Sequence, residues 1–354
     1  MKSNRYKIMI VFCTIFFIFN SKAQFKYIEP PIDMIKVLDI IVDTIEYKDV
    51  TRYLPKDYKK DGSVDYTEYL QKAIEENERI LLPNFPLLIN DKGLHLYDNS
   101  KIYFQKGTSI LLSPSKRSKY AIINLEGVNN VSIYSPKLIG DRLDHIGESG
   151  EWGMGINIRS SSNIQIYNAN IKNCWGDGIY LGSIDGKTPN FNISISGGVI
   201  DNNRRNGISI ISASNVTIKD ILLSNSNGTL PMAGIDIEPN YNLEELHNVR
   251  LDNIITYNNG DVGFLIYLGS MLGSDRKDVQ INLLNCKDYY SKASISIPGL
   301  RNDYDDTIKK INGEIIIDNF SSYHSHILFR KSSGNYVYTP QIKVSNVNFI
   351  PENK

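Results

Sequence analysis

A glycine-led repeat recurs through the middle of this 354-residue chain. Each copy begins with glycine, an apolar residue, a variable residue and a second apolar residue, as in GINI, GIYL, GISI, GIDI and GFLI. Each copy then reaches an apolar stretch led by Asn or Asp, and it closes near an asparagine. The opening glycines are spaced 23, 29, 27 and 29 residues apart, and they are Gly155, Gly178, Gly207, Gly234 and Gly263.

The repeat constrains the fold because each of its strands is too short to bury a face alone. Stacked in register, such strands share one continuous core, as in a solenoid. A sandwich would need hairpin turns, whereas these turns fall at the period of the repeat, and helical patterning is almost absent after residue 80. The sequence therefore predicts an all-β, right-handed parallel β-helix with coils over about 86–350.

The segment DGSVDYTEYLQKAIEEN predicts one amphipathic helix before the first coil, with Tyr69, Leu70, Ala73 and Ile74 as its apolar stripe. A solenoid has to cover its open end, because unpaired edge strands invite aggregation. We expect this helix to belong to an N-terminal cap over about 24–85, so that 24–354 form one domain.

The first 23 residues have the pattern of a signal peptide. Three basic residues precede the apolar run IMIVFCTIFFIF, and small residues end the segment at Ala23. We expect a secreted or periplasmic protein, cleaved near Ala23. The remaining chain has 35 basic and 39 acidic residues, a balance that gives no electrostatic basis for binding nucleic acid or an anionic membrane.

Several motifs resemble those of known β-helix proteins. DGSVDYTEYLQKAI is similar to the opening of pectate-lyase-superfamily β-helix proteins, and GEWGMGI, WGDGIYLG, NRRNGISI and GIDIEPN resemble core motifs of bacterial and phage polysaccharide depolymerases. The resemblance covers nearly all of the chain after residue 23. It implies the right-handed parallel β-helix and the degradation of a polysaccharide, and it does not name the glycan.

The repeat also predicts which side chains share a face, because alternate residues of a strand point in opposite directions. One and three positions after each glycine the residues are apolar, so they face the core. Two and four positions after it they face outward on one sheet. The outward residues are Asn157, Arg159, Tyr180, Gly182, Ser209, Ile211, Asp236, Glu238, Leu265 and Tyr267.

Three carboxylates near this face are the predicted catalytic residues. Asp236 and Glu238 lie two residues apart on one strand, about 6.5–7 Å, and Asp177 lies two coils from Asp236, roughly 10 Å along the axis. Inverting glycosidases hold their acid and base about 6.5–9.5 Å apart, and retaining enzymes about 5–5.5 Å. Asp236 and Glu238 are therefore predicted as the acid/base pair of an inverting hydrolase, with Asp177 as an alternative partner. Equally, all three can be solvated surface residues, and Asp177 can be an Asp–Gly turn residue.

Arg204 and Arg205 occupy the turn beside these carboxylates. They are predicted to bind a carboxylate or sulfate of an acidic sugar, or to keep an aspartate ionised. An arginine could also serve as the base of a polysaccharide lyase acting on uronates, and calcium would then be the implied cofactor, whereas the hydrolase needs none. The third interpretation is a non-catalytic glycan-binding solenoid, which requires aromatic residues but no carboxylates.

The predicted aromatic contacts come from two turns and a long polar loop, DRLDHIGESGEWGMG. Trp152 and Trp175 share one offset in successive coils, so stacked indoles could form a platform for a sugar ring, or each could seal its turn against the core. Tyr180 is expected to pack against a sugar ring. His145 and Glu151 are predicted to reach the substrate from the loop.

The other polar residues are assigned to structure. Cys174 and Cys286 share an offset four coils apart, roughly 19 Å, and are expected to be buried free thiols. No metal site is predicted, since the histidines lack ligand spacing and RNDYDDT favours a solvated turn over calcium. The expected partner is a polysaccharide, and the sequence leaves the oligomeric state open. A turn ladder is predicted from Asn173, Asn202, Asn225, Asn258 and Asn285.

Overall fold

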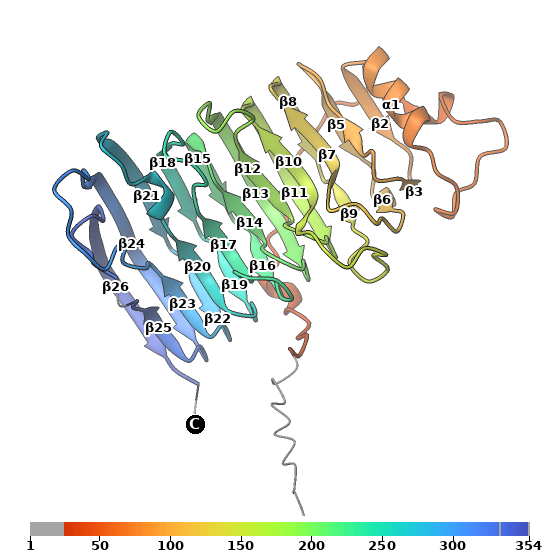
Figure 1. The fold of residues 1–354 in the computed structure, drawn as a ribbon. Coiled ribbons are helices and arrows are strands. Elements are labelled where there is room, and N and C mark those ends of the chain that lie inside the picture. The colour runs from red at the N-terminus through yellow and green to blue at the C-terminus, as the bar shows by residue number, and fades with distance from the viewer. Residues whose placement is uncertain (1–24, 333, 353–354) are drawn as a thin grey trace, which may run out of the picture.

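The computed structural model describes residues 25–332 and 334–352, so the predicted signal peptide lies outside the described residues. The chain winds into a solenoid whose strands stack coil upon coil (Figure 1). All pairings between its strands are parallel. The β-helix predicted from the glycine-led repeat is confirmed.

One face of the solenoid is a nine-stranded sheet made of the strands that open each repeat. Its strands, in spatial order, are β4 (Leu94–His95), β7 (Lys119–Glu126), β10 (Trp152–Arg159), β12 (Ile179–Gly182), β14 (Ile208–Ile210), β17 (Ala233–Ile237), β20 (Val262–Ile266), β23 (Ala293–Ser296) and β25 (Ile327–Arg330). We call this the site sheet, because it carries the predicted carboxylates.

The remaining strands form a seventeen-stranded sheet that closes the rest of each coil. They are β1 (Lys48–Asp49), β2 (Arg79–Leu82), β3 (Pro86–Ile89), β5 (Lys101–Phe104), β6 (Ser109–Leu112), β8 (Asn129–Tyr134), β9 (Lys137–Ile139), β11 (Ser162–Lys172), β13 (Asn190–Asp201), β15 (Ala213–Lys219), β16 (Leu222–Ser224), β18 (Leu246–Asp252), β19 (Ile255–Tyr257), β21 (Lys277–Leu284), β22 (Lys287–Tyr289), β24 (Ile311–Tyr323) and β26 (Gln341–Ile350).

The core lies between the two sheets and runs the length of the solenoid. The residues one and three positions after each glycine are fully buried in it, as predicted: Ile156, Ile158, Ile179, Leu181, Ile208, Ile210, Ile235, Ile237, Phe264 and Ile266. Parallel pairing puts like residues in register, for example Ile208 on Ile235. Burying a branched aliphatic side chain contributes about 1.5–3 kcal/mol, so each coil is stabilised mainly by its neighbours.

The predicted helix is present as α1 (Thr67–Glu76), beside 3-10 turns η1 (Ile32–Met34), η2 (Val50–Arg52) and η3 (Gly269–Met271). Leu70, Ala73 and Ile74 are buried as expected. Tyr69 is not: it is 41% exposed, and its ring meets Tyr66 edge-on. Thr67 takes the buried position instead, one turn before Leu70, because a helical face repeats every three to four residues.

The turns between coils are held by asparagines with left-handed backbones. All five residues of the predicted ladder have φ between 51° and 58°, a region that asparagine tolerates better than most residues. Asn202 Nδ2 donates to Asn173 Oδ1 at 2.8 Å, and Asn258 Nδ2 donates to Asn225 Oδ1 at 2.7 Å. An aspartate links these two pairs, since Asn225 also donates to Asp201. The ladder is confirmed for these four asparagines, whereas Asn285 lies in a separate row, in register with Asn253, and donates to Asp252.

An N-terminal strap, residues 25–47, runs along the turns of the middle coils (red in Figure 1). Asn225 accepts from the Ile28 N–H at 3.2 Å and donates to the Ile28 carbonyl at 3.0 Å. Asn168 does the same with Leu38, at 2.7 and 2.9 Å. Asn168 and the ladder residue Asn225 thus tie the strap to the solenoid.

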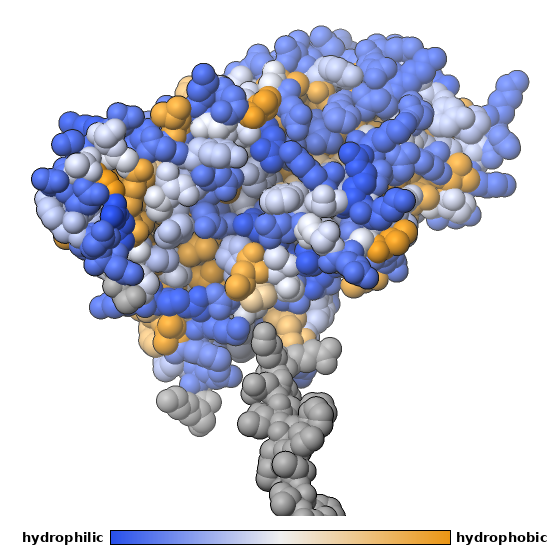
Figure 2. All heavy atoms as spheres, viewed as in Figure 1, coloured by the Kyte–Doolittle hydropathy of each residue, from blue (hydrophilic) through white to orange (hydrophobic). Residues whose placement is uncertain are grey.

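Hydrophilic side chains cover most of the face in Figure 2, with hydrophobic residues in separate small patches. Cys174 and Cys286 are buried and unbonded to each other, as expected. Among the described residues, no helix combines the length and apolar character needed to cross a bilayer.

Candidate active site

The outward row of the site sheet carries the predicted site. Asn157, Tyr180, Ser209 and Asp236 lie in register on the consecutive strands β10, β12, β14 and β17. The row points away from the core, as the alternation predicted, but it is not an open surface: Ser209 and Asp236 are fully buried. Neighbouring turns cover it, and Asn240, from the turn after β17, donates to the Tyr180 hydroxyl at 3.1 Å.

Arg205 brings the carboxylates of several coils together. Its Nη1 lies 3.2 Å from Asp177 Oδ2 and 3.6 Å from Asp236 Oδ2. Its Nε lies 3.7 Å from Glu151 Oε2. Both side chains therefore reach the same guanidinium nitrogen, although their coils are predicted to be roughly 10 Å apart along the axis.

Two neutral side chains complete this cluster between the aspartates. Ser209 Oγ donates to Asp177 Oδ2 at 2.8 Å and lies 3.5 Å from Asp236 Oδ2. Asn206 donates its backbone N–H to Asp177 Oδ1 at 3.1 Å and its amide to Asp236 Oδ2 at 2.9 Å. We call Asp177, Arg205, Asn206, Ser209 and Asp236 the buried cluster.

Burial raises the pKa of all three predicted catalytic carboxyls. Desolvation raises the pKa of Asp236 to about 8, opposed by Arg205 and reinforced by Glu238 and Asp177. Burial also raises the pKa of Asp177, against Arg205 and Ser209. Glu238, which is only partly buried, has its pKa raised by the same desolvation. A neutral carboxylic acid at Asp236 beside Glu238 is an arrangement suited to acid/base chemistry.

Arg205 stays charged in this setting. Burial alone would lower its pKa, but Asp177, Asp236 and Glu151 raise it above the usual value. Only 14% of its side chain is exposed, compared with 33% for Glu151. Arg205 is thus the member of the buried cluster that lies nearest to solvent.

Arg204 points elsewhere, although it precedes Arg205 directly. Its guanidinium stacks on the Trp175 ring at 3.9 Å and donates to the Gly150 carbonyl at 2.8 Å. His145 stacks on Trp175 as well, at 3.9 Å between ring centroids, and its side chain is fully buried. These contacts anchor the polar loop to the turn before β12.

The two tryptophans do not form the stacked platform considered from the sequence. Trp175 packs against the core and stacks with His145, whereas Trp152 is 43% exposed. Loop 141–151 is inserted before β10. The two tryptophans therefore have different surroundings, although they occupy the same position in successive repeats. Tyr180 is buried with the Arg159 guanidinium 4.6 Å from its ring centroid.

Four buried polar atoms at the site have no hydrogen-bond partner among the described residues: Asp236 Oδ1, Arg205 Nε, Trp175 Nε1 and His145 Nε2. An unpaired buried polar atom costs about 1–3 kcal/mol, so their concentration here is unfavourable for folding alone. Unpaired buried polar atoms of this kind are typical of functional sites.

Sequence reasoning missed Asn206 and Ser209 as members of the cluster, and Asp141 as the partner of His145. Asp141 Oδ2 lies 2.7 Å from His145 Nδ1, and the Tyr120 hydroxyl donates to Asp141 Oδ1 at 2.6 Å. Ser209 and Asn206 had a usable signal, since they flank Gly207 at the offsets of Asp236 and Asp177. Asp141 had none, because the loop has no repeat to align.

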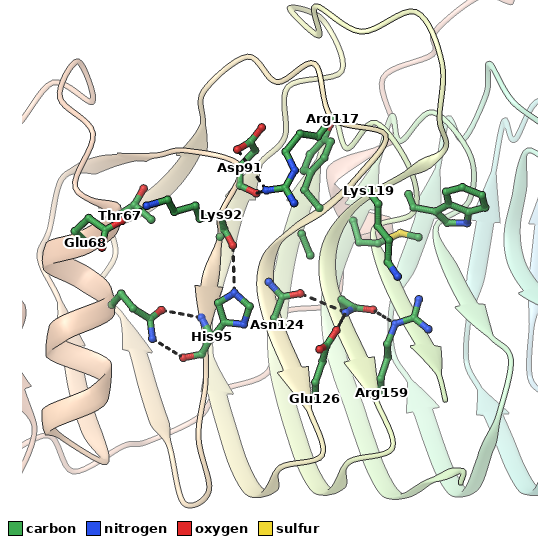
Figure 3. A pocket seen from close by; sticks show the side chains of 17 residues that line it. Thr67, Glu68, Asp91, Lys92, His95, Arg117, Lys119, Asn124, Glu126 and Arg159 are labelled. Carbon is green, nitrogen blue, oxygen red and sulfur yellow. Dashed lines mark hydrogen bonds and ion pairs between the residues drawn. The ribbon is translucent and has the colours of Figure 1, made fainter. Parts of the chain in front are cut away.

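A pocket of about 530 Å³ lies on the site sheet beside the cluster. It is lined by residues of β4, β7 and β10 and by α1, and Figure 3 shows Arg117 and Lys119 at one end and Glu126 and Arg159 at the other. Within the described ranges no three His, Cys, Asp or Glu residues are grouped so as to hold a metal ion.

Sequence comparison gives one matching family model and relatives at low identity. A family model described as "Right handed beta helix region" matches residues 154–287. The uncharacterized protein YclG of Bacillus subtilis (strain 168) is 27% identical over 231 residues, which cover 56% of this chain. The chain spans only 40% of the length of YclG.

Solved structures share the fold at low identity. An iota-carrageenase complexed to iota-carrageenan fragments superposes with a TM-score of 0.59 and 11% identity, covering 89% of this chain and 92% of its own. The family 28 exopolygalacturonase of Yersinia enterocolitica has a TM-score of 0.54 and 14% identity, covering 85% and 71%. The chain is a right-handed parallel β-helix that resembles, in its fold, this carrageenase and this exopolygalacturonase.

Proposed function

We propose that the chain is a secreted enzyme that degrades an extracellular polysaccharide, and specifically an inverting glycoside hydrolase. The observation that carries the proposal is the pair Asp236 and Glu238, two residues apart at the end of β17, with the pKa of Asp236 raised to about 8 by burial. Glycoside hydrolysis needs one protonated and one ionised carboxyl group, kept apart by their surroundings. The carrageenase and exopolygalacturonase act on polysaccharides within the same fold.

In this mechanism Asp236 is the general acid and Glu238 the general base. Asp236 holds its proton at neutral pH and donates it to the glycosidic oxygen as the C–O bond breaks. Glu238, which is partly exposed to solvent, acts in its ionised form and takes a proton from the attacking water. Asp177 lowers the cost of the charge on Arg205 and stays in the buried cluster.

Access to Asp236 requires a movement of Arg205. Asp236 has no exposed surface, whereas Glu238 is partly exposed. Arg205 contacts Asp236 and is itself partly exposed. An anionic substituent of the substrate would draw the guanidinium outward, because charge-assisted bonds to carboxylate or sulfate are strong, and this movement would uncover the acid.

The lyase alternative depends on Arg204 as the base. Arg205 is unsuited to that role, since its carboxylate neighbours raise its pKa. Burial lowers the pKa of Arg204, and this observation favours Arg204 over Arg205 for abstracting a proton. A non-catalytic solenoid would bind glycan and turn nothing over.

The test is an assay of the mature chain on neutral, carboxylated and sulfated polysaccharides, following reducing ends and unsaturated-uronate absorbance together. The hydrolase gives reducing ends alone, and Glu238→Gln lowers turnover at least a hundredfold with little change in binding. Glu245→Gln, an exposed carboxylate outside the site, is the matched control and should keep full turnover. A rise in unsaturated-uronate absorbance would establish a lyase. Glycan binding without any turnover in the unmodified chain would establish a binding solenoid.

A further inference from the structure

Of the site residues predicted from the sequence, only Trp152 lines the pocket beside the buried cluster. It lies on the same outward row, since Asn157 at its edge is in register with Tyr180 and Asn124 is in register with Asn157. A glycan lying along the site sheet would cross it before reaching Asp236. A volume near 530 Å³ falls within the usual range of about 300–1,000 Å³ for ligand pockets.

The charges in the pocket are unequally paired. Lys92 is neutralised by Glu68 at 2.6 Å, and Arg117 lies 3.8 Å from Asp91. Lys119 has no carboxylate within 4.0 Å among the described residues, and neither has Arg159. Unpaired cations beside a cavity attract anions.

Arg159 is held in place even though no acid pairs with it. Its neighbour across the rung is Glu126, but the Glu126 carboxylate accepts from Asn157 Nδ2 at 2.9 Å. Arg159 Nε donates to Asn157 Oδ1 at 3.0 Å, and Nη1 donates to the Ser183 carbonyl at 2.9 Å. Its guanidinium, stacked on Tyr180, is therefore already oriented before any ligand binds.

An exposed aromatic ring stands next to the other cation. Trp152 is in register with Lys119 on the adjacent strand and is 43% exposed. In Figure 3 the side chains of Lys119 and Arg159 extend toward each other across the pocket. A ring surface with two converging, unpaired cations matches a sugar that carries a negative group.

We propose that this pocket is a subsite for an anionic sugar residue, whose carboxylate or sulfate is bound by Lys119 and Arg159 while its ring lies on Trp152. The inference rests on the proposed function in one respect only, namely that the ligand is a glycan. It adds the substrate class: an acidic polysaccharide, bound with its charged residue on the β7–β10 side of the carboxylates.

The test measures binding rather than turnover. Three tetrasaccharides, a neutral galactan, a sulfated galactan and a galacturonate, are titrated calorimetrically against the Glu238→Gln chain and the same chain carrying Lys119→Ala, Arg159→Gln or Trp152→Ala. Lys119→Ala should weaken binding of the anionic probes about tenfold or more and leave the neutral probe unchanged. Trp152→Ala should weaken all the probes that bind. Lys137→Ala, an exposed lysine of the other sheet, is the control and should change nothing.

The anionic probe that binds more tightly decides between carboxylate and sulfate, and raising the salt concentration should weaken it selectively. Equal affinities for charged and neutral probes, no saturable binding of either charged probe, or no effect of Lys119→Ala would each overturn the subsite. Anionic binding without turnover in the unmodified chain would keep the subsite and overturn the hydrolase. Turnover of a neutral glycan, together with no preference for the anionic probes, would keep the hydrolase and overturn the subsite.

Discussion

A single guanidinium, that of Arg205, faces the carboxyl groups of Asp177, Asp236 and Glu151. One positive charge cannot neutralise all of them, and removing charges from water is costly. The carboxyl with the least compensation therefore retains a proton. Asp236, whose Oδ1 has no partner among the described residues, is that group.

Stability should consequently depend on pH through Asp236. Its pKa is about 8 in the folded chain, against about 3.9 when unfolded. Between these values the folded state holds the extra proton, so the free energy of unfolding falls as pH rises from about 4 to about 8. Asp236→Asn cannot titrate, and its Tm relative to the unmodified chain should rise by several degrees between about pH 5 and pH 8.

Thermal unfolding followed by circular dichroism at a series of pH values checks this prediction. Glu245→Gln removes an exposed carboxylate and should track the unmodified chain throughout. A Tm difference for Asp236→Asn that stays constant with pH would show that Asp236 is ionised in the fold.

Strand alternation was enough to place Asp236 on the outward row, in register with Ser209, because only backbone geometry was needed. Glu238 follows the last residue of β17, and its place on that row stays a prediction. It was not enough to find the shared guanidinium. The direction of a long side chain that leaves a turn depends on contacts between coils, and the sequence of one coil does not contain them.

Among the elements, the turns depend most on one residue type. Asn285 has φ of 56°, donates from Nδ2 to Asp252 Oδ1 at 2.7 Å and accepts from Asn319 Nδ2 at 2.7 Å. Glycine would keep this backbone at little cost, whereas an alanine side chain would strain it. Asn285 therefore combines a backbone requirement with side-chain hydrogen bonds to neighbouring coils.

Asn285→Ala should be less stable than Asn285→Gly by about 1 kcal/mol, and both should be less stable than the unmodified chain. The order must reverse in α1, where Lys72→Ala should be more stable than Lys72→Gly by about 1 kcal/mol. Urea unfolding of the four variants measures both differences. If alanine and glycine are equally tolerated at 285, the left-handed turn is not a constraint there.

The elements themselves were largely predictable, because repeats and periodicity report burial directly. The exception within α1 is Tyr69, counted in the apolar stripe but exposed. Aromatic residues satisfy a hydrophobic pattern whether or not they are buried. The face of α1 that is buried depends on where the first coil lies, and the sequence pattern of the helix does not contain that information.

At the scale of the whole molecule, a solenoid has contacts mainly between neighbouring coils. The N-terminal strap adds contacts of another kind: Asn258 donates to the Lys26 carbonyl at 3.0 Å, 232 residues away in sequence. No repeat or motif in the sequence indicates the strap. Its bonds are made by backbone groups, which every sequence provides, so the strap could not be predicted from residue types.

Asn168→Ala should release the strap locally. The Leu38 amide donates to Asn168 Oδ1, so its hydrogen exchange should become at least tenfold faster in this variant. Asn163→Ala is the matched control. Asn163 has a similar φ of 55°, but it donates to Asn129 of the neighbouring coil and not to the strap. Exchange at Leu38 that responds equally to both variants would mean that strap and solenoid open together.

The strap also limits how this protein can change in length. It is bonded near Leu38 to the coil of Asn168 and near Lys26 to the coil of Asn258. Each added coil lengthens the stack by about 4.8 Å, and a strap of fixed length would then miss its asparagines. Insertion or duplication of coils is thus compatible with the strap only outside 168–258, so any β-helix that keeps this strap should differ in length only beyond those coils.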